Sequence, residues 1–349
     1  MFSKFFNKFF NLTKNEKYFA ATFFIFVFSL LAFTFYGPNY NGTGKPILLG
    51  VPKGSSFNSV VDSLLSKKII PSKMQLKTAA FLFGVEKNIK AGRYEIPDGI
   101  NYVNLLKLLV DGVPQAQKLV TIQEGIWQTD LAELLHDQLG IDEKKFLELS
   151  SDKKFINSLG LNVNSLEGYL LPETYYFYEG STAEEILTKL SQEMDKLFAK
   201  PEVVEQMKNM KLSKDQILTM ASIIDGESNQ VEEFKRISGV YYNRIRDGWR
   251  LQADPTVQYL ARQRRKIVNK VYYKDLEIDS KYNTYIYYGL PPSPINNPGK
   301  EAIMAALFPE QHNYFYFVAD GNGGHVFSKS GNEHNRQVAR YRNWRENNK

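Results

Sequence analysis

An uncharged, strongly apolar run at residues 18–36 constrains this chain more than any other part of its sequence. The run reads YFAATFFIFVFSLLAFTFY, which is 19 residues. About 20 apolar residues are needed to cross the hydrocarbon core of a bilayer. Because the run is apolar on every face, it does not suit a helix that lies on a protein surface. The sequence therefore predicts a single N-terminal transmembrane helix over residues 18–36.

The charges on either side of this run predict its orientation. Glu16 is the one acidic residue before it, and four lysines outweigh that charge: Lys4, Lys8, Lys14 and Lys17. Residues 37–42 follow the run and carry no charge. Since the positive flank stays in the cytoplasm, we expect a single-pass protein of the cytoplasmic (inner) membrane, with residues 37–349 on the extracytoplasmic (periplasmic) side. A cleaved signal peptide and a buried core helix are the alternatives, although a signal peptide has an apolar region of only about 7–15 residues.

The composition excludes several kinds of site. The 349 residues include no cysteine, which removes disulfides, thiolate zinc sites and cysteine nucleophiles. The histidines show no spacing typical of a metal site, so we expect no metal and no cofactor; they are His136, His312, His325 and His334. The net charge of +6 is scattered, apart from a basic run at residues 262–266. We interpret that run as a solvated or polymer-facing surface and expect no nucleic-acid partner.

One strand–turn–helix unit occurs twice. Residues 47–52 are an apolar run typical of a strand, a turn with Gly54 follows, and residues 60–65 have the apolar spacing of an amphipathic helix. The pattern returns 71 residues later, where Gly125 takes the place of Gly54. Glycine is needed where the chain turns sharply from strand to helix. The first unit resembles a LysM-like glycan-binding module, and an ordinary packing unit that binds nothing is the alternative.

The segment at residues 166–178 is unusually rich in aromatic side chains. It holds five aromatic residues together with the carboxylates of Glu167 and Glu173. Aromatic faces stack on sugar rings and carboxylates accept hydrogen bonds from sugar hydroxyls, so the segment suits a glycan. A strand and turn packed in the core is the alternative.

A helix with two acids at its end begins near Ser213. Ser213 is its predicted cap, and Gln216 three residues later completes a capping box. Asp225 and Glu227 both flank the apolar stripe of this helix at its C-terminal end. Gly226 between them is expected to loosen or stop the helix.

This placement predicts acids with a raised pKa. The negative end of the helix dipole and apolar neighbours both disfavour a charged carboxylate. A carboxylic acid that stays protonated near neutral pH can donate a proton to a glycosidic oxygen. The alternative is that both acids are exposed helix-end residues, and the helical pattern does not choose between Asp225 and Glu227.

The C-terminal part combines polar loops with short elements. Residues 251–256 and 282–285 are polar clusters, and a helix is expected at residues 300–307. A strand at residues 314–318 and a return strand from His325 predict a hairpin. Polar loop residues of this kind suit ligands rich in hydroxyl and acetamido groups.

Several motifs resemble those of the YceG-like endolytic murein transglycosylases, and the resemblance covers nearly the whole chain after the apolar run. They are EGYLLPETY at 167–175, ASIIDGES at 221–228, LQADPT at 251–256, YNTY at 282–285, GLPP at 289–292, and YFVADG at 316–321 with His325. The resemblance implies cleavage inside peptidoglycan strands, between N-acetylmuramic acid and N-acetylglucosamine. The product end would be a 1,6-anhydro sugar. It further implies termination of strand elongation and a partnership with peptidoglycan synthases.

The resemblance also implies roles for single residues. The second acid of the ASIIDGES motif is catalytic in the family, which carries over to Glu227, whereas Asp225 stands where the family usually has glutamate and is given a supporting position. We expect six residues to bind substrate: Gln252, Asp254, Asn283, Tyr285, Glu173 and His334. A lytic transglycosylase needs one acid, whereas a hydrolase flanks the bond with two carboxylates. A membrane-anchored glycan-binding scaffold without activity and a muramidase that uses Asp225 with Glu227 are the alternatives.

Together these observations predict an α+β protein with one transmembrane helix. Its expected parts are a cytoplasmic N-terminus at 1–17, the transmembrane helix at 18–36, a linker at 37–45, a small LysM-like module at 46–115, and a mixed α+β lytic transglycosylase domain at 116–349.

Overall fold

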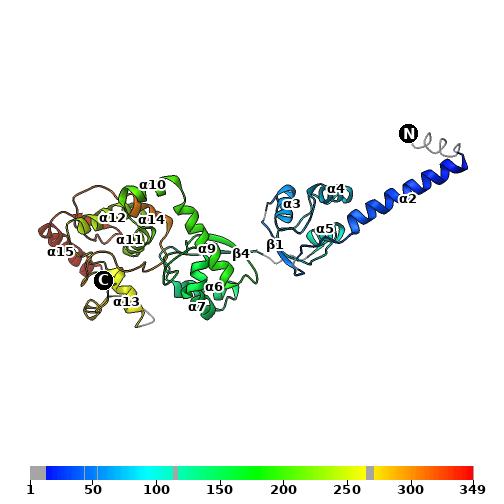
Figure 1. Ribbon diagram of the computed structural model, residues 1–349. Helices are drawn as coiled ribbons and strands as arrows, with labels where there is room; N and C mark the ends of the chain where they lie inside the picture. The colour runs from blue at the N-terminus through cyan, green and yellow to red at the C-terminus, as the bar shows by residue number, and fades with distance from the viewer. Residues whose placement is uncertain (1–12, 43, 53, 113–116, 265–270, 349) are drawn as a thin grey trace. The chain divides into compact units, whose positions relative to one another are not determined.

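The computed structural model divides into two compact units (Figure 1), the first Met1–Gln117 and the second Lys118–Lys349. Both units combine helices with small sheets, and the three sheets of the described residues have two strands each. The mixed α+β class is therefore confirmed. The structure describes residues 13–42, 44–52, 54–112, 117–264 and 271–348. Four of the basic residues discussed above lie outside these ranges: Lys4, Lys8, Arg265 and Lys266.

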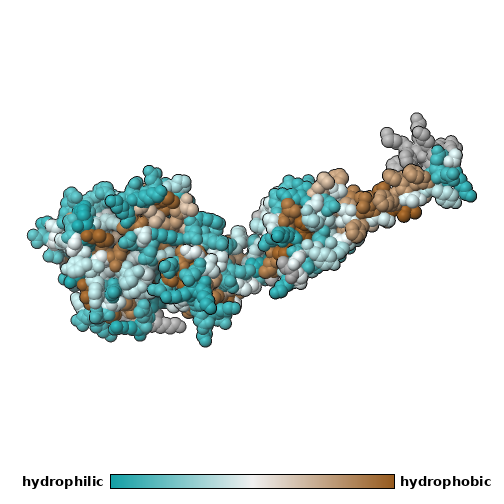
Figure 2. All heavy atoms as spheres, viewed as in Figure 1, coloured by the Kyte–Doolittle hydropathy of each residue, from teal (hydrophilic) through white to brown (hydrophobic). Residues whose placement is uncertain are grey.

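The first unit begins with helix α2 (Lys14–Tyr36), which contains the apolar run. Thr13 caps this helix, since its side chain accepts a hydrogen bond from the backbone N–H of Glu16, whose side chain bonds back to Thr13. None of the helix residues is buried, and apolar side chains cover much of its surface in Figure 2. A core helix would be buried, so that interpretation is wrong. The helix is long and apolar enough to cross a membrane.

A small sheet and three helices form the core of the first unit. The elements after α2 are β1 (Ile47–Val51), α3 (Phe57–Ser66), α4 (Lys73–Phe83), β2 (Gly92–Ile96) and α5 (Tyr102–Asp111). The two strands pair antiparallel, with Leu49 opposite Tyr94. Leucines from the sheet and from each helix are completely buried in one apolar cluster: Leu49, Leu64, Leu76 and Leu105.

The second unit opens with the predicted repeat of the strand–turn–helix arrangement. Strand β3 (Gln117–Thr121) leads through Gly125 into α6 (Gln128–Leu139), as β1 leads through Gly54 into α3. The φ angle is +83° at Gly54 and +69° at Gly125, a left-handed conformation that favours glycine. The need for glycine at both turns is confirmed.

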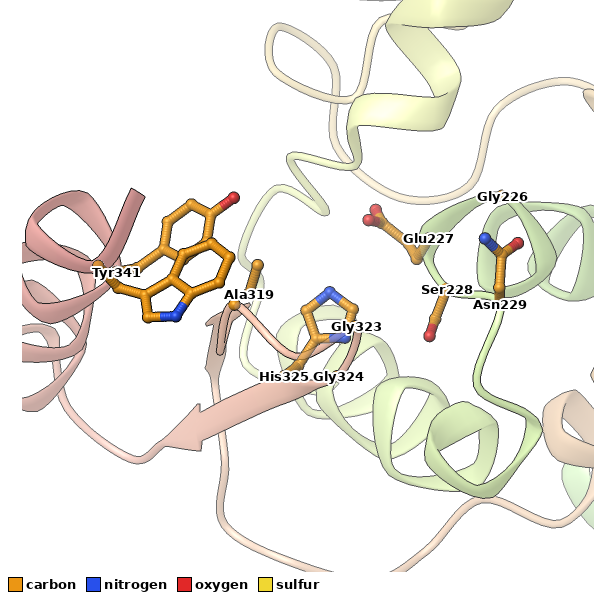
Figure 3. Close-up of a pocket in the computed structure, with 11 residues that line it drawn as sticks. Gly226, Glu227, Ser228, Asn229, Ala319, Gly323, Gly324, His325 and Tyr341 are labelled. Carbon is orange, nitrogen blue, oxygen red and sulfur yellow. The ribbon is translucent and has the colours of Figure 1, made fainter. Parts of the chain in front are cut away.

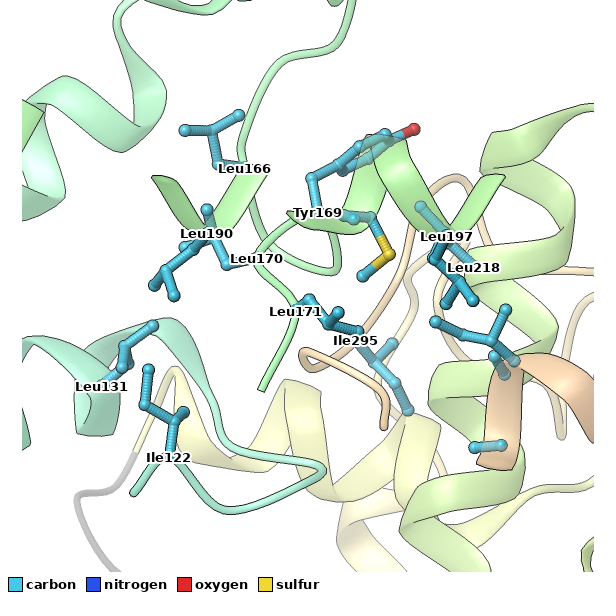
Figure 4. Close-up of a cluster of buried hydrophobic side chains, with 14 of the residues drawn as sticks. Ile122, Leu131, Leu166, Tyr169, Leu170, Leu171, Leu190, Leu197, Leu218 and Ile295 are labelled. Carbon is cyan, nitrogen blue, oxygen red and sulfur yellow. The ribbon is translucent and has the colours of Figure 1, made fainter. Parts of the chain in front are cut away.

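The aromatic segment contributes mainly to the core. Strand β4 (Thr174–Tyr178) pairs with β3, and Tyr169, Tyr175 and Phe177 are buried, whereas Tyr176 is half exposed. Figure 4 shows Tyr169 among leucines from several segments of the second unit. The core interpretation is therefore confirmed for the three buried rings.

Helix α11 (Lys214–Glu227) lies in the core of the second unit. Ser213 and Gln216 form the predicted capping box at its start. Residues 217–224 are all buried, because three helices pack against α11, and Figure 4 shows Leu218 within that packing. These helices are α12 (Val231–Arg246), α13 (Asp254–Arg262) and α14 (Lys300–Leu307).

The helix ends one residue after Gly226, so the expected end of the helix near this glycine is confirmed to within one residue. The helix continues through Glu227, and Ser228 is its C-cap. A Cβ at position 226 would lie 2.7 Å from Cβ of Pro255. Gly226 therefore serves close packing, since the missing side chain lets the end of α11 pass the start of α13.

The remaining elements complete the second unit. They are α7 (Glu143–Ser151), α8 (Lys153–Ser158), α9 (Ala183–Phe198), α10 (Pro201–Met210), the short 3₁₀ helix η1 (Tyr273–Asp275), β5 (Tyr316–Ala319), β6 (His325–Ser328) and α15 (Gly331–Asn347). Strands β5 and β6 pair antiparallel with Ala319 opposite His325. The predicted helix at 300–307 and the hairpin return at His325 are confirmed, and the strand expected from residue 314 begins at Tyr316.

Candidate active site

Glu227 is the last residue of α11, and helix α12 holds its carboxylate. Tyr241 on α12 is fully buried and donates a hydrogen bond from its hydroxyl to Oε1 of Glu227. Arg244 follows three residues later on the same face of α12, and its Nε donates to the carbonyl oxygen of Phe315 at 2.8 Å. One helix therefore supplies both the donor that fixes the carboxylate and a positive charge close to it.

The surroundings of Glu227 suit an acid that also acts as a base. Burial raises the pKa of the Glu227 carboxyl to about 7; the hydrogen bond from Tyr241 lowers this pKa, Asp254 raises it and Arg244 lowers it. Glu227 still reaches solvent, because it lines two cavities. A carboxyl group with a pKa near 7 exists in both forms at neutral pH, so it can donate a proton and later accept one.

The first cavity brings four of the predicted substrate-binding residues to Glu227. It has a volume of about 420 Å³, and we call it the Asp254 pocket. Its lining includes the predicted residues Gln252, Asp254, Tyr285 and His334. Tyr285 donates a hydrogen bond to Oδ1 of Asp254 at 2.6 Å. Three separate segments of the chain, which carry Gln252 with Asp254, Tyr285, and His334, therefore converge on one acid.

Gln252 enters this pocket from a strained backbone. Its φ angle is +51°, which is uncommon for a residue with a side chain. The backbone N–H of Gln252 donates to the carbonyl of Thr284 at 3.1 Å, and that of Ala253 donates to the Thr284 hydroxyl at 2.9 Å. Strain of this kind persists only where surrounding contacts enforce it, and it concentrates at functional sites.

The second cavity also includes Glu227 and lies beside the β5–β6 hairpin. It has a volume of about 350 Å³, and we call it the hairpin pocket. Figure 3 shows Glu227 and Ser228 across an open space from Tyr341, with His325 between them. The lining comes from the end of α11, the hairpin and α15, and includes Ser228, Asn229, Gly321, Gly323, Gly324, His325, Tyr341 and Trp344.

Two predicted substrate-binding residues line neither pocket. Asn283 is completely buried; its Nδ2 donates to the carbonyls of Leu276 and Ile278, both at 2.9 Å, and its Oδ1 accepts from the N–H of Tyr285. Asn283 thus shapes the loop that carries Tyr285. Glu173 is exposed beside the β3–β4 sheet, where its carbonyl accepts a hydrogen bond from the N–H of Ile122.

Asp225 also points away from both pockets. Its Oδ2 accepts a hydrogen bond at 2.6 Å from the N–H of Gly299, the N-cap of α14. Burial raises the pKa of Asp225 to about 7, the hydrogen bond from Gly299 lowers it, and Glu124 raises it. The carboxylate thus ties the end of α11 to the start of α14, next to the Gly125 turn.

Several residues that line the pockets or hold Glu227 were not predicted from the sequence. Tyr241 and Arg244 share a helical face at a spacing of three, which a search for polar residues at that spacing could have found. The Glu233 carboxylate binds Nδ1 of His325 at 2.7 Å, and no local pattern connects positions so far apart in the sequence. Among the residues that the structure describes, no three His, Asp or Glu side chains gather in a way that could hold a metal ion.

Comparisons with known proteins identify a family and several relatives of this chain. The profile of the YceG-like family matches residues 49–340. A Bacillus subtilis (strain 168) protein named endolytic murein transglycosylase is 33% identical over 307 residues, which covers 84% of this chain and 84% of that protein. A protein of the same name from Streptococcus pneumoniae serotype 2 (strain D39) is 28% identical over 94% of this chain and 66% of its own length. The crystal structure of a yceG-like protein from Listeria monocytogenes superposes with a TM-score of 0.58 at 33% identity, and the match covers 84% of this chain and 99% of that one.

Proposed function

This chain belongs to the YceG-like family, and from that membership we propose that it is an endolytic murein transglycosylase in which Glu227 is the single catalytic acid and base. Its substrate is then the glycan strand of peptidoglycan. The observation that carries the assignment is the position of Glu227: it is partly buried, bonded to Tyr241, and open to two cavities at once.

The reaction needs one carboxyl group and no water. Protonated Glu227 donates its proton to the oxygen between N-acetylmuramic acid and N-acetylglucosamine, and the bond from that oxygen to the muramic C1 breaks. The muramic C6 hydroxyl then attacks C1, and the Glu227 carboxylate accepts the hydroxyl proton. The product is a 1,6-anhydro sugar, and Glu227 has regained its starting proton. An internal nucleophile also gains from proximity.

The Asp254 pocket provides groups for the muramic ring. The carboxylate of Asp254, held by Tyr285, stabilises positive charge that develops at C1. Gln252 and His334 orient the sugar. Asn283 does not touch the sugar; it positions Tyr285 by accepting a hydrogen bond from the backbone N–H of Tyr285.

The geometry gives no support to a muramidase that pairs Asp225 with Glu227. Such an enzyme needs both carboxylates beside the scissile bond, whereas Asp225 is bonded to the N–H of Gly299 and lines neither pocket.

The test is product analysis with Glu227→Gln, using Asp225→Asn as the matched control on the same helix. Full-length protein in detergent is incubated with purified sacculi, and the released muropeptides are identified by mass spectrometry. We expect Glu227→Gln to lose about a thousandfold in rate, whereas Asp225→Asn keeps most of the activity because an amide oxygen can still accept from Gly299. Anhydro ends released by Glu227→Gln at the wild-type rate would refute the assignment. Reducing ends from the wild type would indicate a muramidase, and intact but bound glycan a scaffold.

The first unit anchors the enzyme near its substrate in this proposal. Helix α2 is the single-pass anchor in the cytoplasmic membrane, with residues 37–349 outside. The strand–helix–helix–strand order of β1, α3, α4 and β2 supports a LysM-like module that contacts glycan. An anchored endolytic enzyme cuts strands close to the membrane, which suits termination of new strands and a partnership with peptidoglycan synthases.

A further inference from the structure

We propose that the hairpin pocket binds the N-acetylglucosamine ring on the leaving-group side of the scissile bond, with the Trp344 indole as its stacking surface and His325 as a hydrogen-bonding partner. The identity of the sugar rests on the proposed function. The pocket itself is carried by four independent observations.

The first observation is that Glu227 is common to both pockets. The acid must reach the oxygen that joins two sugar rings, so each ring needs space adjacent to that acid. The Asp254 pocket offers a carboxylate to the ring that becomes positively charged. The hairpin pocket is therefore left for the ring that departs as a neutral alcohol.

The second observation is the aromatic wall formed by α15. The rings of Tyr341 and Trp344 are stacked, with centroids 6.0 Å apart and an interplanar angle of 14°. Gly321 lies against the indole so closely that a Cβ there would be 2.4 Å from Cδ2 of Trp344. The ring is thus fixed, yet Trp344 remains 38% exposed. The part of this fixed ring that stays exposed can attract the C–H groups of a pyranose through the negative quadrupole of the indole.

The third observation is a histidine held by a carboxylate at the pocket wall. Glu233 accepts hydrogen bonds from the backbone N–H of His325 at 2.8 Å and from its ring Nδ1 at 2.7 Å. With the proton on Nδ1, the other ring nitrogen, Nε2, is an acceptor. The structure gives Nε2 no partner among the described residues, and His325 lines the pocket. It can therefore accept a hydrogen bond from a sugar hydroxyl or acetamido N–H.

The fourth observation concerns charge. The described residues that line the hairpin pocket include no lysine or arginine, whereas the Asp254 pocket contains Arg244. An anion such as a phosphate would find no cationic partner on the hairpin side. Aromatic, amide, hydroxyl and imidazole groups match a neutral N-acetylated sugar.

The test measures the binding of a sugar probe to the full-length Glu227→Gln variant in detergent, in which no turnover occurs. The probe is chitotriose, a neutral oligomer of N-acetylglucosamine, and affinity is measured by isothermal titration calorimetry. We expect Trp344→Ala to weaken binding about tenfold, because the stacking surface is lost, and Trp344→Phe to retain most of the affinity. Tyr273→Ala is the matched control, since Tyr273 is 89% exposed and lines neither pocket. Equal affinity of Trp344→Ala and Tyr273→Ala would overturn the proposal.

A second readout leaves the fold untouched. The chain has three tryptophans, so its NMR spectrum contains three indole N–H signals, and Trp344→Phe identifies one of them by its loss. Titration with chitotriose should shift that signal and leave the Trp127 signal in place; no shift at Trp344 would contradict the proposal. These readouts do not depend on catalysis. Chitotriose binding at Trp344 together with reducing ends from the wild type would refute the transglycosylase and keep the sugar site.

Discussion

The carboxyl groups whose pKa is shifted differ between the two units of this protein in the direction of the shift and in its cause. In the described part of the first unit, the carboxyl groups with a shifted pKa are Glu16 and Asp62. Both pKa values are lowered. The main cause is a hydrogen bond with the Thr13 side chain for Glu16 and a hydrogen bond with the Lys73 side chain for Asp62. In the described part of the second unit, the shifted carboxyl groups all have a raised pKa, with burial as the first cause: Glu124, Glu167, Asp225 and Glu227.

Acids of the second unit with a raised pKa contact the loops around the end of α11; Glu167 and Asp225 are partly buried and Glu124 is exposed. Oε1 of Glu167 accepts from the N–H of Gln128 at 2.9 Å, and Asp225 accepts from that of Gly299 at 2.6 Å. Glu124 lies against Gly299 as well. A buried carboxyl group costs stability when it ionises. The comparison therefore indicates that the second unit gives up some stability to position Glu227, whereas the first unit keeps its charges in water.

The largest expected effect is that the second unit loses stability as pH rises from 5 to 8. A raised pKa means that the folded unit holds protons which the unfolded chain has released, so the free energy of unfolding falls with pH. The pKa is about 8 for Glu167 and about 7 for Asp225 and Glu227. Each group contributes at most about 1.4 kcal/mol per pH unit, and less where solvent reaches it. The lowered pKa values of the first unit act only at more acidic pH, so its stability should stay flat over this range.

Tryptophan fluorescence during urea denaturation measures the second unit alone, because Trp127, Trp249 and Trp344 all belong to it. Hydrogen exchange of its amides follows the first unit in the same samples. Glu167→Gln serves as the internal check, since an amide keeps the acceptor for Gln128 and cannot ionise. We expect this variant to flatten the pH dependence. A second unit whose stability is unchanged between pH 5 and pH 8 would break the comparison.

A smaller effect should separate the two turn glycines. Either glycine changed to alanine forces a side chain into the left-handed region, at a cost of about 1 kcal/mol. No atom of the described residues lies within 4 Å of a Cβ added at Gly54, whereas a Cβ at position 125 would lie 3.0 Å from Oδ1 of Asp225, which Gly299 holds in place. We therefore expect Gly54→Ala to cost about 1 kcal/mol and Gly125→Ala about 2 to 3 kcal/mol.

The free energy of unfolding of each variant is measured as before: by tryptophan fluorescence during urea denaturation for Gly125→Ala, and by amide hydrogen exchange of the first unit for Gly54→Ala. Gly125→Ala should also lower transglycosylase activity, because Asp225 lies two residues before Glu227. An equal loss of stability in the two variants would show that a side chain at position 125 meets no more steric hindrance than one at position 54.

The smallest effect concerns one buried tyrosine from each unit. The Tyr94 hydroxyl donates to the backbone carbonyls of Lys90 and Leu109, whereas that of Tyr241 donates to Glu227. Tyr94→Phe should cost about 1 kcal/mol of stability and leave catalysis unchanged. Tyr241→Phe removes a bond that lowers the pKa of Glu227, so Glu227 should stay protonated to higher pH.

The pH profile of kcat/KM between pH 5 and 9 distinguishes these outcomes. In the wild type, activity should fall as pH rises through about 7, where Glu227 loses its proton. We expect Tyr241→Phe to move this descending limb to higher pH and Tyr94→Phe to leave it in place. An identical limb in Tyr241→Phe would mean that the tyrosine does not control the acid.

Much of the local structure could be predicted because its causes lie within a few residues. The Ser213–Gln216 capping box, the glycines at positions 54 and 125 and the helix at 300–307 depend on neighbours in the sequence. The site could be predicted only in part. Asp254 and Tyr285 were found as polar loop residues, but Asn283 belongs to the same kind of loop and is buried beneath it.

The sequence by itself determined the apolar helix, the repeated strand–turn–helix unit and the helix that ends in two acids, since charge, periodicity and capping act over short distances along the chain. The tertiary structure decided which acid faces the pockets. Asp225 turns toward the N–H of Gly299, and Glu227 turns toward Tyr241 and the two cavities. It also brought Glu233 to His325. These outcomes depend on how distant segments pack around α11, which no local pattern contains.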